Sequence, residues 1–187
     1  MRIQAGQLKK GEFVVYQGDI WQVQKAEFYA PGKGSALMRA KIKNVVSGKN
    51  IDYTFKSSES VETIEVQSIE MQYLYKDIEF GYFMDERTYN QYQVPVAVVG
   101  ESLQYLKEGE KVYVYVQDEK PLSVRPPMAV RLKITATEDA AKGDTVSNAR
   151  KPATVETGAM VMVPLFCKVG DVIVINPEEG EYTGRES

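Results

Sequence analysis

The sequence predicts an all-β protein made of three small β-barrels, and three observations carry this prediction. Most of the chain falls into short runs of β-branched and aromatic residues that end in a turn signal. Glycine followed by an acidic residue opens a predicted strand at Gly11, Gly109 and Gly170. The formal charge changes sign near residues 63–64, and paired prolines at 126–127 would interrupt a β-ladder. We therefore expect domains at residues 1–63, 64–127 and 128–187.

The expected elements run in order along the chain. Strands are predicted at residues 13–16, 19–28, 36–43, 51–55, 112–116 and 172–175. One segment departs from this pattern, because apolar residues at helical spacing predict a helix from Val96 to Lys107, which Gly109 ends. The middle third holds 8 of the 12 tyrosines. Because that third is acidic, packing in a β core is favoured over a platform for stacking RNA bases.

The composition excludes several classes of protein. The 187 residues contain no histidine and one cysteine, Cys167. Catalytic triads built on histidine, the usual zinc enzymes and an intrachain disulfide are therefore excluded. No apolar run approaches the ~20 residues that span a bilayer, and the first residues lack the apolar stretch of a secretory signal. The absence of histidine also makes catalysis less favoured without excluding it, because enzymes can work without histidine. We expect a cytoplasmic protein that is not an enzyme, with no cofactor and no membrane partner.

Charge is distributed unevenly along the chain. Residues 1–63 carry 10 Lys and Arg against 6 Asp and Glu, whereas residues 64–127 carry 6 against 11. This split indicates that the first third meets a polyanion and the middle third does not. The acidic side chains of the middle third have no ordered ligand spacing, so a solvated face is favoured over a metal site. They are Glu65, Glu70, Asp77, Glu79, Asp85 and Glu86.

A short loop holds the first candidate functional residue, Lys33. The loop lies between two predicted strands, and Pro31, Gly32 and Gly34 surround the lysine. Proline fixes its own φ and glycine adopts angles that other residues avoid, so the predicted turn presents Lys33 at a hairpin tip. Four or five projecting residues would reach on the order of 15 Å. A nucleotide-binding loop is excluded, because the glycine that a Walker motif needs is replaced by Glu27.

The strand that leaves this loop has two different faces. The two-residue period of a strand places Arg39, Lys41 and Lys43 on one face together with Leu37. The other face carries Met38, Ala40 and Ile42, which suit a core. The hairpin is thus predicted to be a basic arm, although a solvated turn lysine is the commoner explanation for a single residue such as Lys33.

The last third offers two weaker candidates. Residues 142–152 form a polar loop with basic ends, and Tyr182 and Arg185 place an aromatic ring and a guanidinium near the end of a strand. Such a pair suits contact with phosphate or ribose. Taken alone, the first of these segments is better explained as an ordinary loop, and the second as ordinary residues of a tail.

Together these motifs resemble the bacterial elongation factor P family over essentially the whole chain. The motifs are the Pro31–Gly34 loop, Lys41–Asn44 with Ser47–Gly48, Glu70–Tyr75, Tyr82–Asp85, Lys142–Thr145, Lys151–Gly158, Val163–Phe166 and Gly180–Tyr182 with Arg185. The resemblance implies an SH3-like domain followed by two OB-fold domains, in an L-shaped outline like that of tRNA. It also implies a translation factor that binds both ribosomal subunits beside peptidyl-tRNA and relieves stalling at consecutive prolines.

The resemblance also implies roles for individual residues. Lys33 matches the tip residue that reaches the peptidyl-transferase centre and often bears an added lysine-like group. A lysine-modifying enzyme that acts on Lys33 is therefore an implied partner. No DNA partner is expected. Tyr182 and Arg185 match contacts to RNA. Gly143, Asp144 and Thr145 match a loop near the exit-site codon. The chain departs from the family at Asn148 and Ala149, where glycines are usual, and at residues 123–127.

Three other functions remain open at the level of sequence. A paralogue of the factor would share the fold and prefer a different stalling motif. A general RNA-binding OB-fold protein would bind free single strands with a steep dependence on salt. A hydrolase using acids of the middle third would need a pair of carboxyls with shifted pKa values, and no spacing nominates such a pair.

Overall fold

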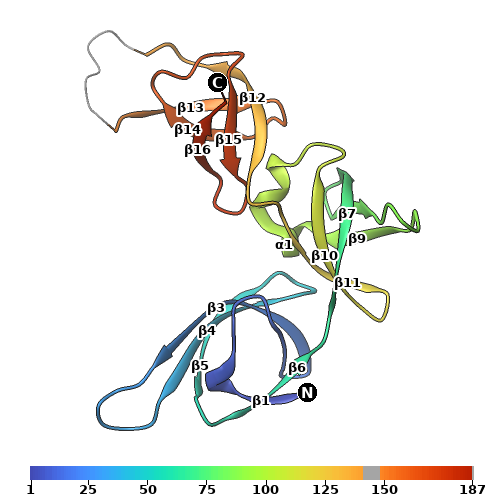
Figure 1. The fold of residues 1–187 in the computed structure, drawn as a ribbon, viewed down its shortest axis with the longest axis vertical. Helices are drawn as coiled ribbons and strands as arrows, with labels where there is room; N and C mark the ends of the chain where they lie inside the picture. Colours follow the sequence, from blue (N-terminus) through green and yellow to red (C-terminus); the bar gives the residue numbers. More distant parts are fainter. Residues whose placement is uncertain (141–147, 187) are drawn as a thin grey trace.

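The protein is an all-β molecule with three antiparallel sheets, as the sequence predicts. The structure, a computed structural model, describes residues 1–140 and 148–186. Figure 1 shows three bodies that follow one another along the longest axis, with the N-terminus in the first and the C-terminus in the third. Their outline is elongated and bent, and each of the six predicted strands is present with ends within one residue of the expected ones.

The first sheet closes around the N-terminal third. Its strands are β1 (Arg2–Gln4), β2 (Phe13–Tyr16), β3 (Asp19–Tyr29), β4 (Leu37–Asn44), β5 (Asn50–Lys56) and β6 (Ser60–Ile64), with a 3-10 turn, η1 (Ala5–Gln7). The strand order is β1-β6-β2-β3-β4-β5. A buried cluster that includes Trp21, Val23 and Ile42 fills this barrel. β3 and β4 are the longest pair, and their far end extends beyond that core.

The second and third sheets have five strands each. The second contains β7 (Gln67–Lys76), β8 (Phe80–Met84), β9 (Gln91–Pro95), β10 (Lys111–Gln117) and β11 (Lys120–Arg125), in the order β11-β10-β7-β8-β9. The third contains β12 (Val130–Thr137), β13 (Arg150–Val155), β14 (Met160–Pro164), β15 (Val172–Asn176) and β16 (Glu181–Arg185), in the order β14-β13-β12-β15-β16. The sheets are defined by their strands, and the exact domain limits at 1–63, 64–127 and 128–187 remain a prediction from the sequence.

The predicted helix from Val96 to Lys107 is wrong as a single element. The structure has a short α-helix, α1 (Val96–Val99), and then a 3-10 helix, η2 (Gly100–Tyr105). The break falls at Gly100, the first residue of η2, because its φ of +80° lies outside the helical region. The apolar positions are nonetheless buried, since Val98, Leu103 and Leu106 are each less than 5% exposed.

The barrels do not have three separate cores. One continuous buried cluster contains residues of both the second and the third barrel, such as Phe83 and Ile173. A second cluster belongs to the first barrel alone. A small third cluster joins the first barrel to the second through Phe13, Val45 and Leu122. Within the described residues, no helix is both long and apolar enough to cross a membrane.

Candidate functional site

The β3–β4 hairpin forms the arm that the sequence predicts. Its ladder continues to the loop, with Tyr29 opposite Leu37 and Phe28 opposite Met38. Phe28 and Tyr29 are 58% and 46% exposed, so this end of the hairpin has left the core. The backbone N–H of Ser57 donates to the Ala36 carbonyl at 2.9 Å and ties the end of the loop to the barrel. Figure 1 shows the loop projecting sideways from the first barrel.

Lys33 lies at the exposed tip of this arm. Among the residues that the structure describes, no ion pair or side-chain hydrogen bond involves it. The neighbouring glycines leave its stem uncovered, because a Cβ on Gly32 would meet nothing within 4 Å and Gly34 has a φ of +106°. Lys33 is therefore a positive group carried away from the body of the protein, and it does not fold back onto an internal carboxylate.

The stem of the arm carries cations that do have partners. The Arg39 guanidinium lies over the Tyr29 ring at 4.8 Å from its centroid. The Lys25 ammonium pairs with Glu27 at 2.9 Å. A hydrogen bond and the opposite charge raise the pKa of Lys25 and lower that of Glu27. Because both groups are in solvent, this pair contributes little to stability.

β4 has the two faces that the alternation predicts. Met38, Ala40 and Ile42 are each at most 3% exposed, and Arg39 and Lys41 are exposed on the opposite face. Lys43 differs from them, because it lies half-buried beside Gly100 of the second barrel. Burial lowers the pKa of Lys43 below its ordinary value.

Lys41 and Lys43 line a groove of about 880 Å³ between the first two barrels. Lys10 and Arg125 also line it, and these two were not among the predicted site residues. The ammonium of Lys10 pairs with Glu178 of the third barrel at 3.5 Å. Nothing in the local sequence pattern marks Lys10 or Arg125, because the groove forms only when separate barrels meet.

Tyr182 and Arg185 lie on β16 of the third barrel, far along the chain from the arm. Arg185 pairs with Asp171 at 3.6 Å and lies over the Phe166 ring at 5.0 Å. Tyr182 lines a pocket of about 490 Å³, and the guanidinium of Arg150 lies 5.9 Å from its ring centroid. Burial is the main cause that raises the pKa of Tyr182.

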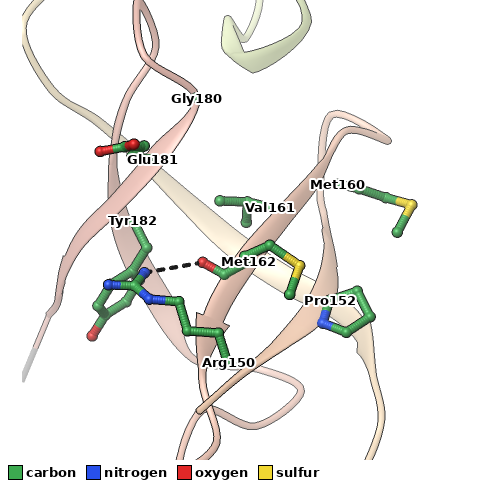
Figure 2. Close-up of a pocket in the computed structure, with 8 residues that line it drawn as sticks. All are labelled: Arg150, Pro152, Met160, Val161, Met162, Gly180, Glu181 and Tyr182. Carbon is green, nitrogen blue, oxygen red and sulfur yellow. Dashed lines mark hydrogen bonds between the residues drawn. The ribbon is translucent and has the colours of Figure 1, made fainter. Parts of the chain in front are cut away.

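Figure 2 shows the pocket beside Tyr182, where Arg150 donates to the Met162 carbonyl at 3.4 Å. Met160 and Met162 are 62% and 50% exposed at the pocket edge. Arg150 was missed at the level of sequence, where it was only one basic end of a polar loop. The pocket combines an aromatic ring, a guanidinium and an apolar wall, and such a combination suits a flat, partly polar group.

The remaining predicted site residues, Gly143, Asp144 and Thr145, lie outside the described residues, so their role stays a prediction. Asn148 and Ala149 are described just beyond that gap. Within the described part of the chain, no group of three or more acidic, cysteine or histidine side chains could hold a metal ion.

Three family models match the chain in order. The elongation factor P KOW-like domain matches residues 4–61, the elongation factor P OB domain matches residues 66–124, and the C-terminal domain of elongation factor P matches residues 130–185. Elongation factor P of Agathobacter rectalis is 43% identical over 183 residues, which cover 98% of this chain and 99% of that protein. The chain belongs to the elongation factor P family. Elongation factor P of Finegoldia magna is 44% identical with the same coverage.

Membership of the elongation factor P family makes this chain a translation elongation factor. It also confirms the expected architecture of an SH3-like barrel followed by two OB folds. A solved structure of translation initiation factor 5A from Methanococcus jannaschii covers 66% of this chain and 93% of its own, at 22% identity and a TM-score of 0.46. That likeness adds nothing to the assignment. The Lys33 arm lies within the KOW-like match, and Tyr182 and Arg185 lie within the C-terminal match.

Proposed function

We propose that this chain acts in the cytoplasm by binding both subunits of the ribosome beside peptidyl-tRNA. There it promotes peptide-bond formation at consecutive prolines. Lys33, extended by a lysine-modifying enzyme, reaches the peptidyl-transferase centre and holds the end of the tRNA. Arg39, Lys41, Lys43, Tyr182 and Arg185 contact RNA along the way.

The observation that carries this proposal is the state of Lys33. It is exposed at the tip of the longest hairpin in the described structure, and no partner there neutralises it. A lysine evolved only for solubility would need neither the long ladder nor the flanking glycines. A cation that must enter a narrow, negatively charged site needs both, because the ladder supplies reach and the glycines keep the tip thin.

The proposed mechanism needs no catalytic group on the protein. Proline is a constrained nucleophile, because its ring fixes φ and crowds the amine. Holding two reactants in a productive geometry recovers rate through orientation alone. A chain without histidine can do this, since its contribution is position and positive charge.

The test compares two exposed lysines of the same barrel. Lys33→Ala removes the tip cation, and Lys49→Ala removes a cation from the turn between β4 and β5. We expect Lys33→Ala to slow the formation of a Pro-Pro-Pro peptide on programmed ribosomes by about tenfold or more. Lys49→Ala should leave the rate unchanged. Equal activity of Lys33→Ala and the parent protein would overturn the proposal.

The mass of the natively purified protein tests the modification separately. The parent protein should carry an added group that maps to the peptide containing Lys33, and Lys33→Ala should not. An unmodified parent with full activity would remove the modifying enzyme from the proposal and leave the role of Lys33 in place.

A further inference from the structure

The first and second barrels meet through a small buried joint. Phe13 of β2, Val45 after β4 and Leu122 of β11 are each at most 7% exposed and form one cluster. The rings of Phe13 and Tyr115 pack edge to face with centroids 5.4 Å apart. Ile20, Ile64, Val66 and Tyr115 are partly buried against these three side chains, and the whole cluster is small compared with a barrel core. Apolar packing of this size alone leaves the angle between the barrels weakly defined.

Polar contacts beside this cluster are directional. The Ser123 hydroxyl on β11 donates to Oε1 of Gln22 on β3 at 2.8 Å. Ser123 is only 4% exposed and Gln22 is half-buried, so this hydrogen bond is part-buried in the groove between the two barrels. It joins a strand of the second barrel to a strand of the Lys33 arm. The bond restricts rotation about the joint, because a change of angle would pull the buried Ser123 hydroxyl away from its acceptor.

The closest approach at the joint involves Gly48 in the turn between β4 and β5. A Cβ on Gly48 would lie 2.3 Å from the Ala97 carbonyl oxygen and 2.6 Å from its carbon. Ala97 belongs to α1 of the second barrel. These neighbours are backbone atoms that cannot swing aside, so only a residue without a side chain allows this contact.

The turn that carries Gly48 is rigid and continues directly from β4. The Asn44 side chain accepts from the backbone N–H groups of Val46 and Ser47, both at 2.9 Å. The Gly48 N–H donates to the Asn44 carbonyl at 3.0 Å. A displacement at the turn is therefore passed on to the strand that leads to Lys33.

The length of β4 turns a small rotation into a large displacement. The strand has 8 residues. At about 3.3 Å per residue it spans about 25 Å, so a tilt of about 5° at the turn would move the base of the Lys33 loop by about 2 Å. An error of about 1 Å in the placement of reacting groups can cost on the order of 100-fold in rate.

We propose that the contact between Gly48 and Ala97, together with the Ser123–Gln22 hydrogen bond, fixes the angle between the first two barrels and so aims the Lys33 arm. The four residues are positioning residues, and none of them needs to touch RNA. That these contacts fix the angle between the barrels depends on the structure alone. That this angle aims the arm for its task rests on the role proposed above for Lys33.

The test uses two glycines with similar backbones and different surroundings. Gly48 has a φ of +73° and Gly18 a φ of +83°, so alanine is strained at both positions. A Cβ on Gly18 would meet nothing within 4 Å. Gly48→Ala therefore adds a clash at the joint, and Gly18→Ala is the matched control for backbone strain within the same barrel.

The angle between the barrels is measured by double electron–electron resonance. Spin labels are placed on Ser58→Cys in the first barrel and Glu86→Cys in the second, two exposed positions away from the joint. The native Cys167 is fully buried and stays unlabelled. We expect one narrow distance distribution for the parent and Gly18→Ala, and a shifted or broadened one for Gly48→Ala. Ser123→Ala, which introduces no strain, should broaden it as well.

The same variants are then assayed for Pro-Pro-Pro synthesis at saturating factor. We expect Gly48→Ala to lower the maximal rate by about tenfold or more, with Gly18→Ala close to the parent. An unchanged distance distribution in both Gly48→Ala and Ser123→Ala would overturn the proposal that these contacts fix the angle between the barrels. A changed distribution with an unchanged maximal rate would overturn its role in aiming the arm. If the parent protein itself did not stimulate Pro-Pro-Pro synthesis, the proposed function would be overturned. The distance distributions would still decide whether these contacts fix the angle between the barrels.

Discussion

Lys43 is the cation of β4 that burial penalises. It lies half-buried beside Gly100, and its pKa is lowered from 10.5 by desolvation. The folded state therefore tolerates the charged form less well than the unfolded state does. Below the pKa of Lys43 in the folded state, both states carry the proton, and the desolvation of the charged Lys43 lowers the stability of the folded state by its full amount. As pH rises through that pKa toward 10.5, the folded state loses its proton first and the penalty disappears.

We therefore predict that Lys43→Met stabilises the protein at pH 7 by about 0.5 kcal/mol after screening by solvent. The advantage over the parent should shrink as pH rises toward the ordinary value for lysine. Urea unfolding from pH 7 to pH 10 measures both quantities. Lys41→Met is the control, because it makes the same chemical change on the same face at an exposed position. A stability difference that grew with pH would contradict this account.

Asp77 and Tyr82 form a coupled pair at the end of the β7–β8 hairpin. The Tyr82 hydroxyl donates to the Asp77 carboxylate at 2.6 Å, and the backbone N–H groups of Phe80 and Glu79 donate to it as well. These bonds favour the charged carboxylate and lower the pKa of Asp77, and the tyrosine bond raises the pKa of Tyr82 to about 12.

Tyr82→Phe should therefore raise the pKa of Asp77 toward, but not up to, its ordinary value, because the two backbone donors remain. Carboxyl NMR titration measures this directly. The stabilising effect of the tyrosine should be present above pH 3.8 and be lost as pH falls through the folded pKa of Asp77. Tyr75→Phe is the control, since Tyr75 stacks on Tyr82 without bonding to Asp77. An Asp77 pKa that stayed the same in Tyr82→Phe would show that the backbone donors alone lower it.

At the scale of one element, the two faces of β4 have different roles. One face packs in the core and contributes to stability, and the other is proposed to contact RNA. Ile42 is fully buried and Lys41 is exposed on the other face. We predict that Ile42→Ala costs about 3 kcal/mol of unfolding free energy, whereas Lys41→Ala changes it by less than about 0.5 kcal/mol. Lys41→Ala should instead reduce the slope of log ribosome affinity against log salt by about one. Denaturation and binding titrations measure the two effects, and an unchanged salt slope in Lys41→Ala would remove it from the RNA-facing set.

The alternation of β4 could be read from the sequence because it is a local property. Met38 and Ile42 are apolar and Arg39 and Lys41 are charged, so the period of a strand sorts them without knowledge of neighbours. The position of Lys43 could not be predicted in this way. Its burial is caused by the second barrel, where Gly100 lies about 60 positions further along the chain.

The wrong helix has a different cause. The apolar spacing after Val96 is helical, and the side chains it marks are indeed buried. Periodicity reports which face is covered and does not distinguish an α-helix from a 3-10 helix over so short a length. Gly100 was the available signal, since glycine inside a helical pattern weakens it.

At the scale of the whole molecule, the three similar strand openings predict three small barrels and say nothing of how their cores are joined. The structure places residues of the second and third barrels in one buried cluster. Tyr105 shows why, because its hydroxyl donates to the Met160 carbonyl at 3.3 Å across the boundary. Lys107 and Glu156 pair across the same boundary at 3.4 Å. No local pattern marks these pairs, since their members are about 50 residues apart.

The shared core predicts that the second and third barrels unfold as one cooperative unit. In native-state hydrogen exchange, the amides of Val114 and Ile173 should share one opening free energy and one dependence on denaturant, and Val23 of the first barrel should follow another. Tyr105→Ala should lower the protection of both Val114 and Ile173 by about 3 kcal/mol, because it empties space at the boundary that both barrels fill.

Val23 should change by less than about 0.5 kcal/mol in Tyr105→Ala, because its cluster contains no residue of the other barrels. The matched variant Val23→Ala should show the converse, with loss of protection in the first barrel and none in Ile173. If Ile173 kept its protection while Val114 lost it, the third barrel would be an independent unit. The second and third barrels would then be in contact through the shared cluster but would unfold independently.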